Sequence, residues 1–287
     1  MQKTILVIGA TGMLGGPVVH HLKNNGFQPR ILARNKEKAK KLFDKSFEVV
    51  AGDVNDTSSL ETALHGCYGV HISLSPETET SGVKNTVMIS SQQKLQRITY
   101  ISGATTFDPN ARMPHTQQKR RLENVIRESG IPYTFFCPVS AMENLPFMVR
   151  GHRASVIGRN PPPVHWFAAD DLGRMVALSY SLEEAKNKKF CIHGPEDIPQ
   201  VELLRRYCDV FHPEIKKISK TPFSMMKIIA LLSRNEGLKW NIPLIAYIEK
   251  VGEPGDPTEA NCILGPPTTT LDEWLEIRKT RLQTATG

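Results

Sequence analysis

Short, mostly apolar runs alternate with longer amphipathic stretches along the first half of the chain. The runs fall at residues 5–8, 29–33, 47–51, 69–74, 97–102 and 131–136. Short apolar runs of this kind are typical of strands in a parallel sheet that is buried on both faces. The stretches between them repeat apolar residues with helical spacing. This alternation predicts right-handed crossovers and a doubly wound parallel sheet, which is an α/β fold.

The first apolar run ends in a glycine-rich turn. Residues 5–8 are followed by Gly9, Gly12 and Gly15, and a helical pattern continues through Leu22. In such a turn one glycine allows the tight bend, one lets the backbone approach a pyrophosphate, and one lets helix and strand pack closely. The start of the helix also offers free N–H groups to an anion. The pattern predicts a dinucleotide phosphate site; the alternative is an ordinary glycine-rich turn.

The end of the second run indicates which dinucleotide is bound. Arg34 stands there, 19 positions after Gly15 (34 − 15 = 19), with Lys36 and Lys38 close behind. An acid at this place binds the ribose 2′-hydroxyl of NAD, whereas an arginine accommodates the 2′-phosphate of NADP. A guanidinium also binds a phosphate through two hydrogen bonds. We therefore expect NADP(H) in preference to NAD(H), unless Arg34 only begins an exposed basic helix over residues 35–43.

Ligands of doubly wound sheets bind outside the carboxyl ends of the strands, so residues at these ends should line one crevice. Asp53 is placed there to accept a hydrogen bond from the adenine amino group, and Val54 to flank the ring. Alternatively, Asp53 is only a turn residue, and Asp56 or Thr57 caps the next helix. The expected crevice residues are residues 9–14, Arg34, Asp53, Val54, Ser73, Leu74, Ser75, Pro76, Ser102 and Gly103.

Three further local structures follow from the pattern. His71 lies inside an apolar strand, so we interpret it as a hydrogen-bonded structural histidine. Residues 82–95 have helical spacing, and Pro76 is expected to stop the strand before them. Asp170 and Asp171 precede a helical pattern over residues 172–181, where an acidic N-cap is common. A pair of carboxylates also suits acid/base work, but we prefer capping.

Composition narrows the classes of function. The 287 residues carry a net charge of +7, but the basic clusters are spread and have no aromatic residues among them. Solvated helix faces explain them better than a nucleic-acid platform does. The five cysteines form no C-x-x-C pair, which argues against zinc and against a disulfide framework. The longest apolar stretch, residues 225–232, is too short to span a bilayer. With no visible signal peptide, we expect a cytoplasmic protein.

Four segments carry a family resemblance: GATGMLG at residues 9–15, SGATT at 102–106, KRRLENVIRESGIPYTFF at 119–136 and PVSAMENL at 138–145. They resemble the NmrA-like family, atypical relatives of the short-chain dehydrogenases that include NADP-binding regulators and NADPH-dependent reductases. The likeness covers roughly residues 1–270. It implies a Rossmann-type NAD(P)-binding domain over residues 1–150. A smaller C-terminal α+β substrate part would cover residues 151–287, with some segments returning to the core sheet.

The resemblance also implies which residues contact ligands. Asn144 would have a structural or pocket role. An apolar helix over residues 222–233, with Phe223 and Met226, lies where the family closes its substrate pocket. We therefore treat this helix as a candidate lid; core packing is the alternative. The implied NADP(H) contacts are Thr11, Gly12, Met13, Leu14, Arg34 and Lys119, with Pro138, Val139 and Ser140 near the nicotinamide.

One departure from the family's relatives concerns catalysis. Short-chain dehydrogenases use Tyr-x-x-x-Lys, in which the lysine lowers the pKa of a proton-donating tyrosine. Here the same spacing joins His115 and Lys119. Lys119 keeps the cationic position, and His115 is either a general acid or base or a solvent-facing residue. Ser102 stands where these enzymes place a substrate-orienting serine, although its hydroxyl also suits the end of the strand.

Two functions fit these features. The first is an NADPH-dependent oxidoreductase that passes hydride to a small quinone, enone, imine or carbonyl acceptor. The second is a non-catalytic redox sensor that binds NADP(H) and regulates a protein partner, which the missing tyrosine favours. A structural or nucleic-acid-associated role, suggested only by the basic charge, is the weakest of the three.

Overall fold

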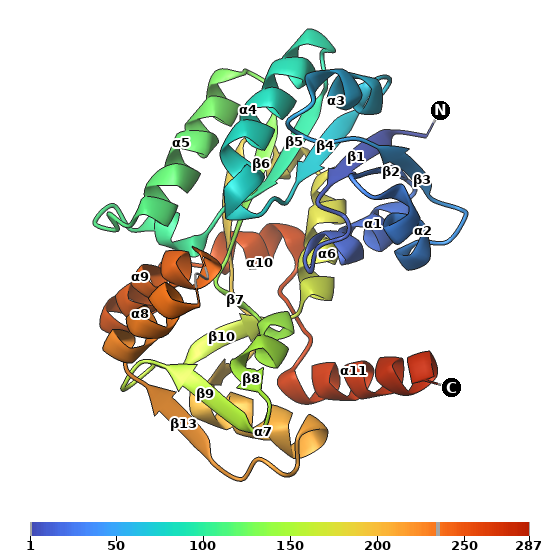
Figure 1. Ribbon diagram of the computed structural model, residues 1–287. Coiled ribbons are helices and arrows are strands. Elements are labelled where there is room, and N and C mark those ends of the chain that lie inside the picture. The colour runs from blue at the N-terminus through green and yellow to red at the C-terminus, as the bar shows by residue number, and fades with distance from the viewer. Residues whose placement is uncertain (1, 234–235, 287) are drawn as a thin grey trace.

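The computed structural model describes residues 2–233 and 236–286 and has a core above a smaller part (Figure 1). Over these residues the core sheet has seven parallel strands in the order β11-β6-β5-β4-β1-β2-β3, so the predicted doubly wound α/β fold is confirmed. The strands are β1 (Thr4–Ile8), β2 (Gln28–Ala33), β3 (Glu48–Ala51), β4 (Gly69–Ile72), β5 (Arg97–Ile101), β6 (Tyr133–Pro138) and β11 (Lys188–Ile192).

The central strand β1 shows why its sequence is continuously apolar. Side chains alternate across a strand, so Ile5 and Val7 pack against one helical layer while Leu6 and Ile8 pack against the other. The first layer contains α1 (Gly15–Asn24), α2 (Lys36–Leu42), α6 (Ala169–Ser179) and α10 (Thr258–Leu264). The second layer contains α3 (Thr57–Leu64), α4 (Pro76–Gln92) and α5 (Pro114–Glu128).

The buried histidine of β4 is a structural residue, as expected. The Nδ1 atom of His71 lies 2.8 Å from the Thr99 hydroxyl oxygen, on the neighbouring strand. Burial lowers the pKa of His71 to about 3, so its ring is neutral near pH 7.

Two local predictions, the start of α4 and the N-cap of α6, were wrong. Helix α4 begins at Pro76, not residue 82, because a proline in the first turn gives up an N–H that a helix leaves unpaired there. Ala168 rather than an aspartate is the N-cap of α6. Asp170 instead pairs with His21 at 3.1 Å, and the Asp171 carboxylate accepts hydrogen bonds from the backbone amides of residues 268 and 269.

The smaller part is built on two three-stranded sheets, and its first strand begins at Ser140, before the expected boundary at residue 150. Segments from the second half of the chain, α6, β11 and α10, return to the core. The sheets contain β7 (Ser140–Ala141), β10 (Val164–Phe167) and β12 (Asp197–Ile198), and β8 (Val149–Arg150), β9 (Arg153–Ile157) and β13 (Ile218–Thr221). The helices are α7 (Gln200–Phe211), α8 (Phe223–Leu232), α9 (Glu236–Val251) and α11 (Leu271–Thr286).

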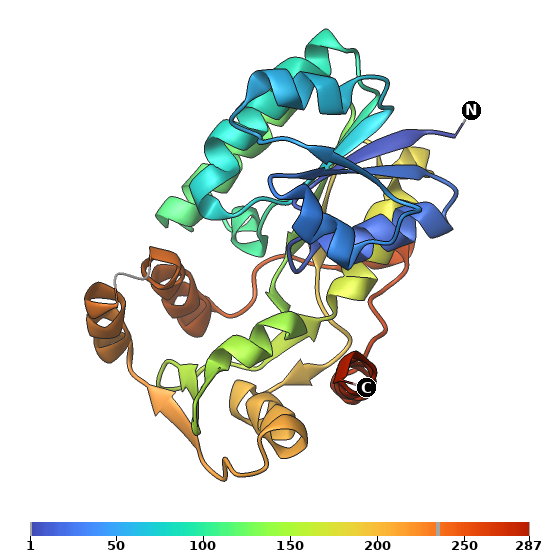
Figure 2. The same ribbon diagram turned by 45° about the vertical axis from the view of Figure 1, so that its right-hand side comes forward.

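Two features of the smaller part bear on the site. Figures 1 and 2 show α8 and α9 side by side, and α9 contacts α5 of the core. The short helix η2 (Met142–Met148) leads into this part from the end of the core sheet. Of the helices in the described residues, none combines the length and apolarity that crossing a bilayer requires.

Candidate cofactor and substrate site

The turn between β1 and α1 needs its glycines for different reasons. Gly9 has a φ of +86°, and a Cβ atom on it would lie 1.8 Å from the carbonyl oxygen of Ser73. A Cβ on Gly15 would lie 2.2 Å from the carbonyl oxygen of Gly9. A Cβ on Gly12 would meet only that same oxygen, at 3.1 Å, so its other side is open to a ligand. This division matches the three tasks that a dinucleotide-binding turn requires.

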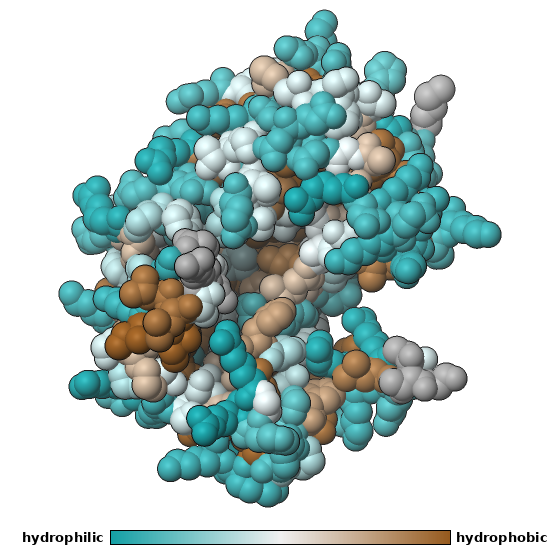
Figure 3. Space-filling model, in the orientation of Figure 1, coloured by the Kyte–Doolittle hydropathy of each residue, from teal (hydrophilic) through white to brown (hydrophobic). Residues whose placement is uncertain are grey.

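A cavity of about 320 Å³ lies at the carboxyl edge of the sheet, where Figure 3 shows the molecule hollowed. Its lining includes ten residues expected from the sequence: Leu14, Ser73, Leu74, Ser102, Gly103, His115, Lys119, Pro138, Val139 and Asn144. It also includes Pro76, which belongs to the crevice expected from the sequence. The sequence reasoning missed seven others: Glu79, Ile101, Ala104, Thr105, Asn241, Leu244 and Ile248. Expected residues outside the lining are Gly9, Thr11, Gly12, Met13, Gly15, Arg34, Lys38, Asp53, Val54, Ser75, Ser140, Phe223 and Met226.

Lys119 lies in this cavity and forms a buried ion pair. Its Nζ atom is 2.5 Å from a carboxylate oxygen of Glu79 and 2.8 Å from the carbonyl oxygen of Ile101. The two residues are only 7% and 2% exposed. An ammonium has three N–H donors, so one remains for a ligand. Such a pair holds the cation rigidly, since leaving either charge buried alone is costly.

Glu79 escaped the sequence reasoning because residues 76–81 were not assigned to a helix. With α4 starting at Pro76, Glu79 falls on the same helical face as the buried residues Val83 and Thr86. An acid on an otherwise buried face signals a buried partner, and this signal would have located the pair.

A model of the NmrA-like family matches residues 1–205. This chain belongs to the NmrA-like family. The matched region holds the glycine turn, Lys119 and most of the cavity lining, and it ends before residue 270, where we expected the likeness to stop.

Three known proteins are similar to this NmrA-like chain. The photosystem II assembly factor Ycf39 of Trieres chinensis is 24% identical over 260 residues, covering 79% of this chain and 75% of that protein. The (4-alkanoyl-5-oxo-2,5-dihydrofuran-3-yl)methyl phosphate reductase of Streptomyces griseus subsp. griseus is 27% identical over 197 residues, covering 68% and 69%. An NADPH-dependent quinone oxidoreductase of Escherichia coli, complexed with NADPH, has the same fold, with a TM-score of 0.77 at 19% identity over 95% of this chain and 99% of that one.

The basic residues in and after β2 differ in their hydrogen bonds and ion pairs. Arg34 is exposed and, among the described residues, forms no hydrogen bond or ion pair. Arg30, four positions earlier, is bound to Glu48 and to two backbone carbonyls. Lys38 is exposed, and its backbone amide donates to Asn35, which caps α2. The free guanidinium of Arg34 is therefore the better candidate for an anion.

The residues predicted to contact the adenine make hydrogen bonds or packing contacts within the protein. Asp53 accepts a hydrogen bond of 2.8 Å from the backbone amide of Asn55, which is the turn role we gave as the alternative. Val54 is 7% exposed and packs into the apolar core. The same alternative named Asp56 or Thr57 as the cap of α3, and Asp56 is the cap, accepting a hydrogen bond from the amide of Ser58. Contacts of Asp53 and Val54 with an adenine remain a prediction.

His115 lies in the cavity of the NmrA-like chain rather than facing solvent. Its ring stands at 75° to that of Trp240, with the centroids 6.1 Å apart. Burial and, to a smaller extent, the positive charge of Lys119 together lower the pKa of His115 to about 4. The imidazole is therefore neutral near pH 7 and has no second proton to give.

Ser102 and the residues of the candidate lid both make contacts within the protein. The Ser102 hydroxyl donates a hydrogen bond of 2.6 Å to Glu123, which satisfies the end of β5. Met226 packs with Ala230 of α8 against Ile242 of α9, and Phe223 lies against this cluster. The cavity wall expected from residues 222–233 is supplied by α9 instead, because α8 lies behind it.

The shifted pKa of His115 leads to a prediction for stability. A histidine with a pKa of about 4 when folded and 6.5 when unfolded binds a proton more readily in the unfolded chain. The free energy of unfolding should therefore fall as the pH is lowered from about 6.5 to about 4. In His115→Gln this dependence should weaken by up to about 1.4 kcal/mol per pH unit. Urea unfolding at several pH values measures both slopes; equal slopes would contradict a neutral buried ring.

Proposed function

We propose that this NmrA-like protein is an NADPH-dependent oxidoreductase acting on small conjugated acceptors such as quinones, enones, imines or carbonyl compounds. One observation carries the proposal. Lys119, which forms an ion pair with Glu79, lies in the same cavity as Pro138 and Val139. These two residues are predicted to lie near the nicotinamide. The names of the similar reductases from Streptomyces griseus and Escherichia coli support the same class of reaction.

Different residues of the chain would bind different parts of the dinucleotide. The open side of Gly12 and the start of α1 would hold the pyrophosphate, and Arg34 would hold the 2′-phosphate. A bound nicotinamide supplies the hydride chemistry. The remaining N–H of Lys119 would orient an oxygen of the cofactor or acceptor. Leu244 and Ile248 of α9 form an apolar wall of the cavity.

The protonation states at the cavity favour an acceptor that needs little acid catalysis. Efficient general acids have pKa values close to the working pH. His115 has a pKa of about 4, and the missing tyrosine leaves no phenol at the usual position. A quinone or another conjugated acceptor takes up hydride with less assistance than an isolated carbonyl, so quinones head the expected substrates.

The test is NADPH loss, followed optically, against a panel of quinones, enones, imines and aldehydes, after binding of NADPH has been established separately. We expect turnover with at least one conjugated acceptor. Binding without turnover across the panel would overturn the proposal. It would favour the second function, a redox sensor with a protein partner, which is supported by the similarity to the assembly factor Ycf39 over 79% of this chain.

The choice of cofactor is a separate prediction. Arg34→Asp should weaken NADPH binding about 10- to 100-fold, because a charged hydrogen-bond pair is lost, and should leave NADH binding nearly unchanged. Lys45→Asp makes the same charge change at an exposed position and serves as the matched control. Isothermal titration calorimetry with NADPH and with NADH measures both affinities and tests this prediction. Equal affinities for NADPH and NADH in the parent protein would refute the assignment to Arg34.

A further inference from the structure

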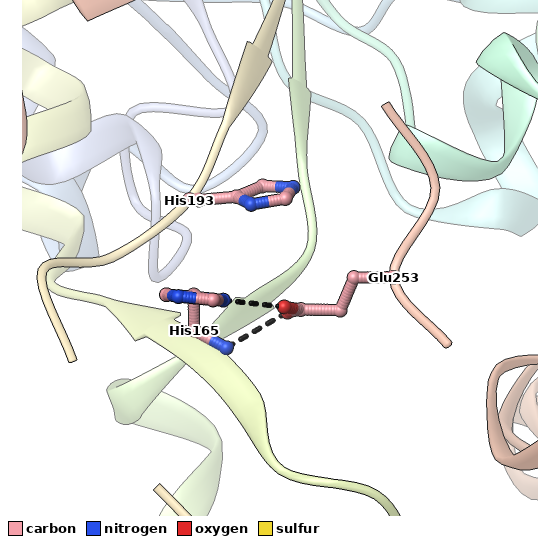
Figure 4. A group of neighbouring side chains, drawn as sticks. All are labelled: His165, His193 and Glu253. Carbon is pink, nitrogen blue, oxygen red and sulfur yellow. Dashed lines mark hydrogen bonds and ion pairs between the residues drawn. The ribbon is translucent and has the colours of Figure 1, made fainter. Parts of the chain in front are cut away.

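A group of three polar side chains lies where three distant segments meet, and none of them lines the cavity. His165 is on β10, His193 follows the end of β11, and Glu253 follows the end of α9 (Figure 4). The two imidazole rings are stacked, with their centroids 5.3 Å apart. Nδ1 of His165 is 2.6 Å from one carboxylate oxygen of Glu253, and the backbone amide of His165 donates to the other at 2.8 Å.

The ring of His193 lies next to the His165–Glu253 pair and has one nitrogen that makes no hydrogen bond to the described residues. Its Nε2 atom is buried and has no hydrogen-bond partner among the residues that the structure describes. When the ring proton of His193 is on Nδ1, Nε2 offers a lone pair to a metal ion, as in a metal-ligating histidine.

We propose that His165, His193 and Glu253 bind one divalent transition-metal ion of the zinc type, with water in the fourth position. Their three potential ligand atoms all lie within 4.8 Å of one another. Ligands of a tetrahedral zinc ion lie about 2.0–2.2 Å from the metal and so roughly 3.3 Å apart. Small side-chain rotations therefore close the site, and the proton of His165 moves from Nδ1 to Nε2 as the metal takes its place.

The donor set selects the class of ion. Two imidazoles and one carboxylate suit zinc, copper, nickel or iron, whereas magnesium and calcium prefer oxygen ligands. The His165 side chain is 35% exposed, so an ion can reach the site from solvent. Two other His–acid pairs, His212 with Glu214 and His21 with Asp170, belong to no such three-residue group within the described chain.

A metal here would have a structural consequence for the cavity. It would tie the loop after α9 to the end of the core sheet and to β10. Helix α9 carries Leu244 and Ile248, which form the apolar cavity wall. Binding of the ion would therefore fix this wall in place, whatever reaction the cavity supports.

The experiment uses full-length protein that has been stripped with a chelator and then titrated with Zn²⁺ by calorimetry. A Cys262→Ser background removes the exposed thiol, which would bind zinc by itself. We expect one ion per chain, and visible absorption bands of a four-coordinate complex when Co²⁺ is used. His193→Ala and Glu253→Gln should each weaken binding by more than about 100-fold, since even outer partners of metal ligands account for about 10–100-fold. His212→Ala is the matched control and should bind as the parent does.

Thermal unfolding keeps the test valid if one variant folds poorly. Zn²⁺ should raise the Tm of the parent and of His212→Ala, and should leave the Tm of His193→Gln unchanged. The proposal is overturned if the stripped parent binds no Zn²⁺ at micromolar concentrations. It is equally overturned if binding survives the substitutions of His193 and Glu253, because the ion would then sit elsewhere.

Discussion

Lys119→Met is expected to lower the free energy of unfolding by about 3–5 kcal/mol and NADPH-dependent turnover by about 100-fold or more. The substitution leaves the carboxylate of Glu79 buried without its cation, since that carboxylate lies 2.5 Å from Nζ and is 2% exposed. It also removes the one donor that remains free to face a ligand. Urea unfolding measures the first effect, and initial rates with the best acceptor measure the second.

Two further variants separate these effects. The double variant Glu79→Gln with Lys119→Met removes both charges, so it should regain most of the lost stability but none of the lost turnover. Lys189→Met is the matched control, because Lys189 pairs with the buried Glu123 at 3.0 Å but does not line the cavity. It should lose stability and keep turnover. Full turnover in stable Lys119→Met protein would show that Lys119 has no role in the reaction.

Gly9→Ala is expected to cost about 3 kcal/mol or more of unfolding free energy and to abolish dinucleotide binding in whatever protein still folds. The added Cβ would lie 1.8 Å from a backbone oxygen of Ser73, so the turn must move away from β4. Gly26 has a similar φ, +82°, but a Cβ there would meet nothing within 4 Å. Gly26→Ala therefore isolates the backbone strain, about 1–2 kcal/mol.

Chemical denaturation of both glycine variants, with calorimetric titration of NADPH, gives the comparison. The difference between them measures the contact with β4 alone, because the strain at positive φ is common to both. Similar losses in the two variants would show that the turn relaxes without cost and that the close approach to Ser73 is not required.

The sequence predicted the features that arise from local interactions. The apolar runs marked the strands because a strand buried on both faces has no polar side to show, as β1 illustrates. The glycine turn could be predicted from the sequence, because the positive φ of Gly9 and the close approach of the Ser73 carbonyl oxygen both exclude a side chain there. Parallel strand order then brought Leu14, Ser73, Ser102 and Pro138 to one edge, and all four line the cavity.

Only the tertiary structure decided which partner each polar group takes. The partner of Lys119 is Glu79, 40 positions away, and the hydroxyl of Ser102 is taken by Glu123. The cavity wall comes from α9 rather than α8, because the packing of the folded chain decides which helix faces the cavity. The low pKa of His115 follows from burial, which no spacing of residues reveals. Local backbone preferences and hydrophobic periodicity are encoded over a few residues, whereas ion pairs, burial and cavity walls depend on segments that meet only after folding.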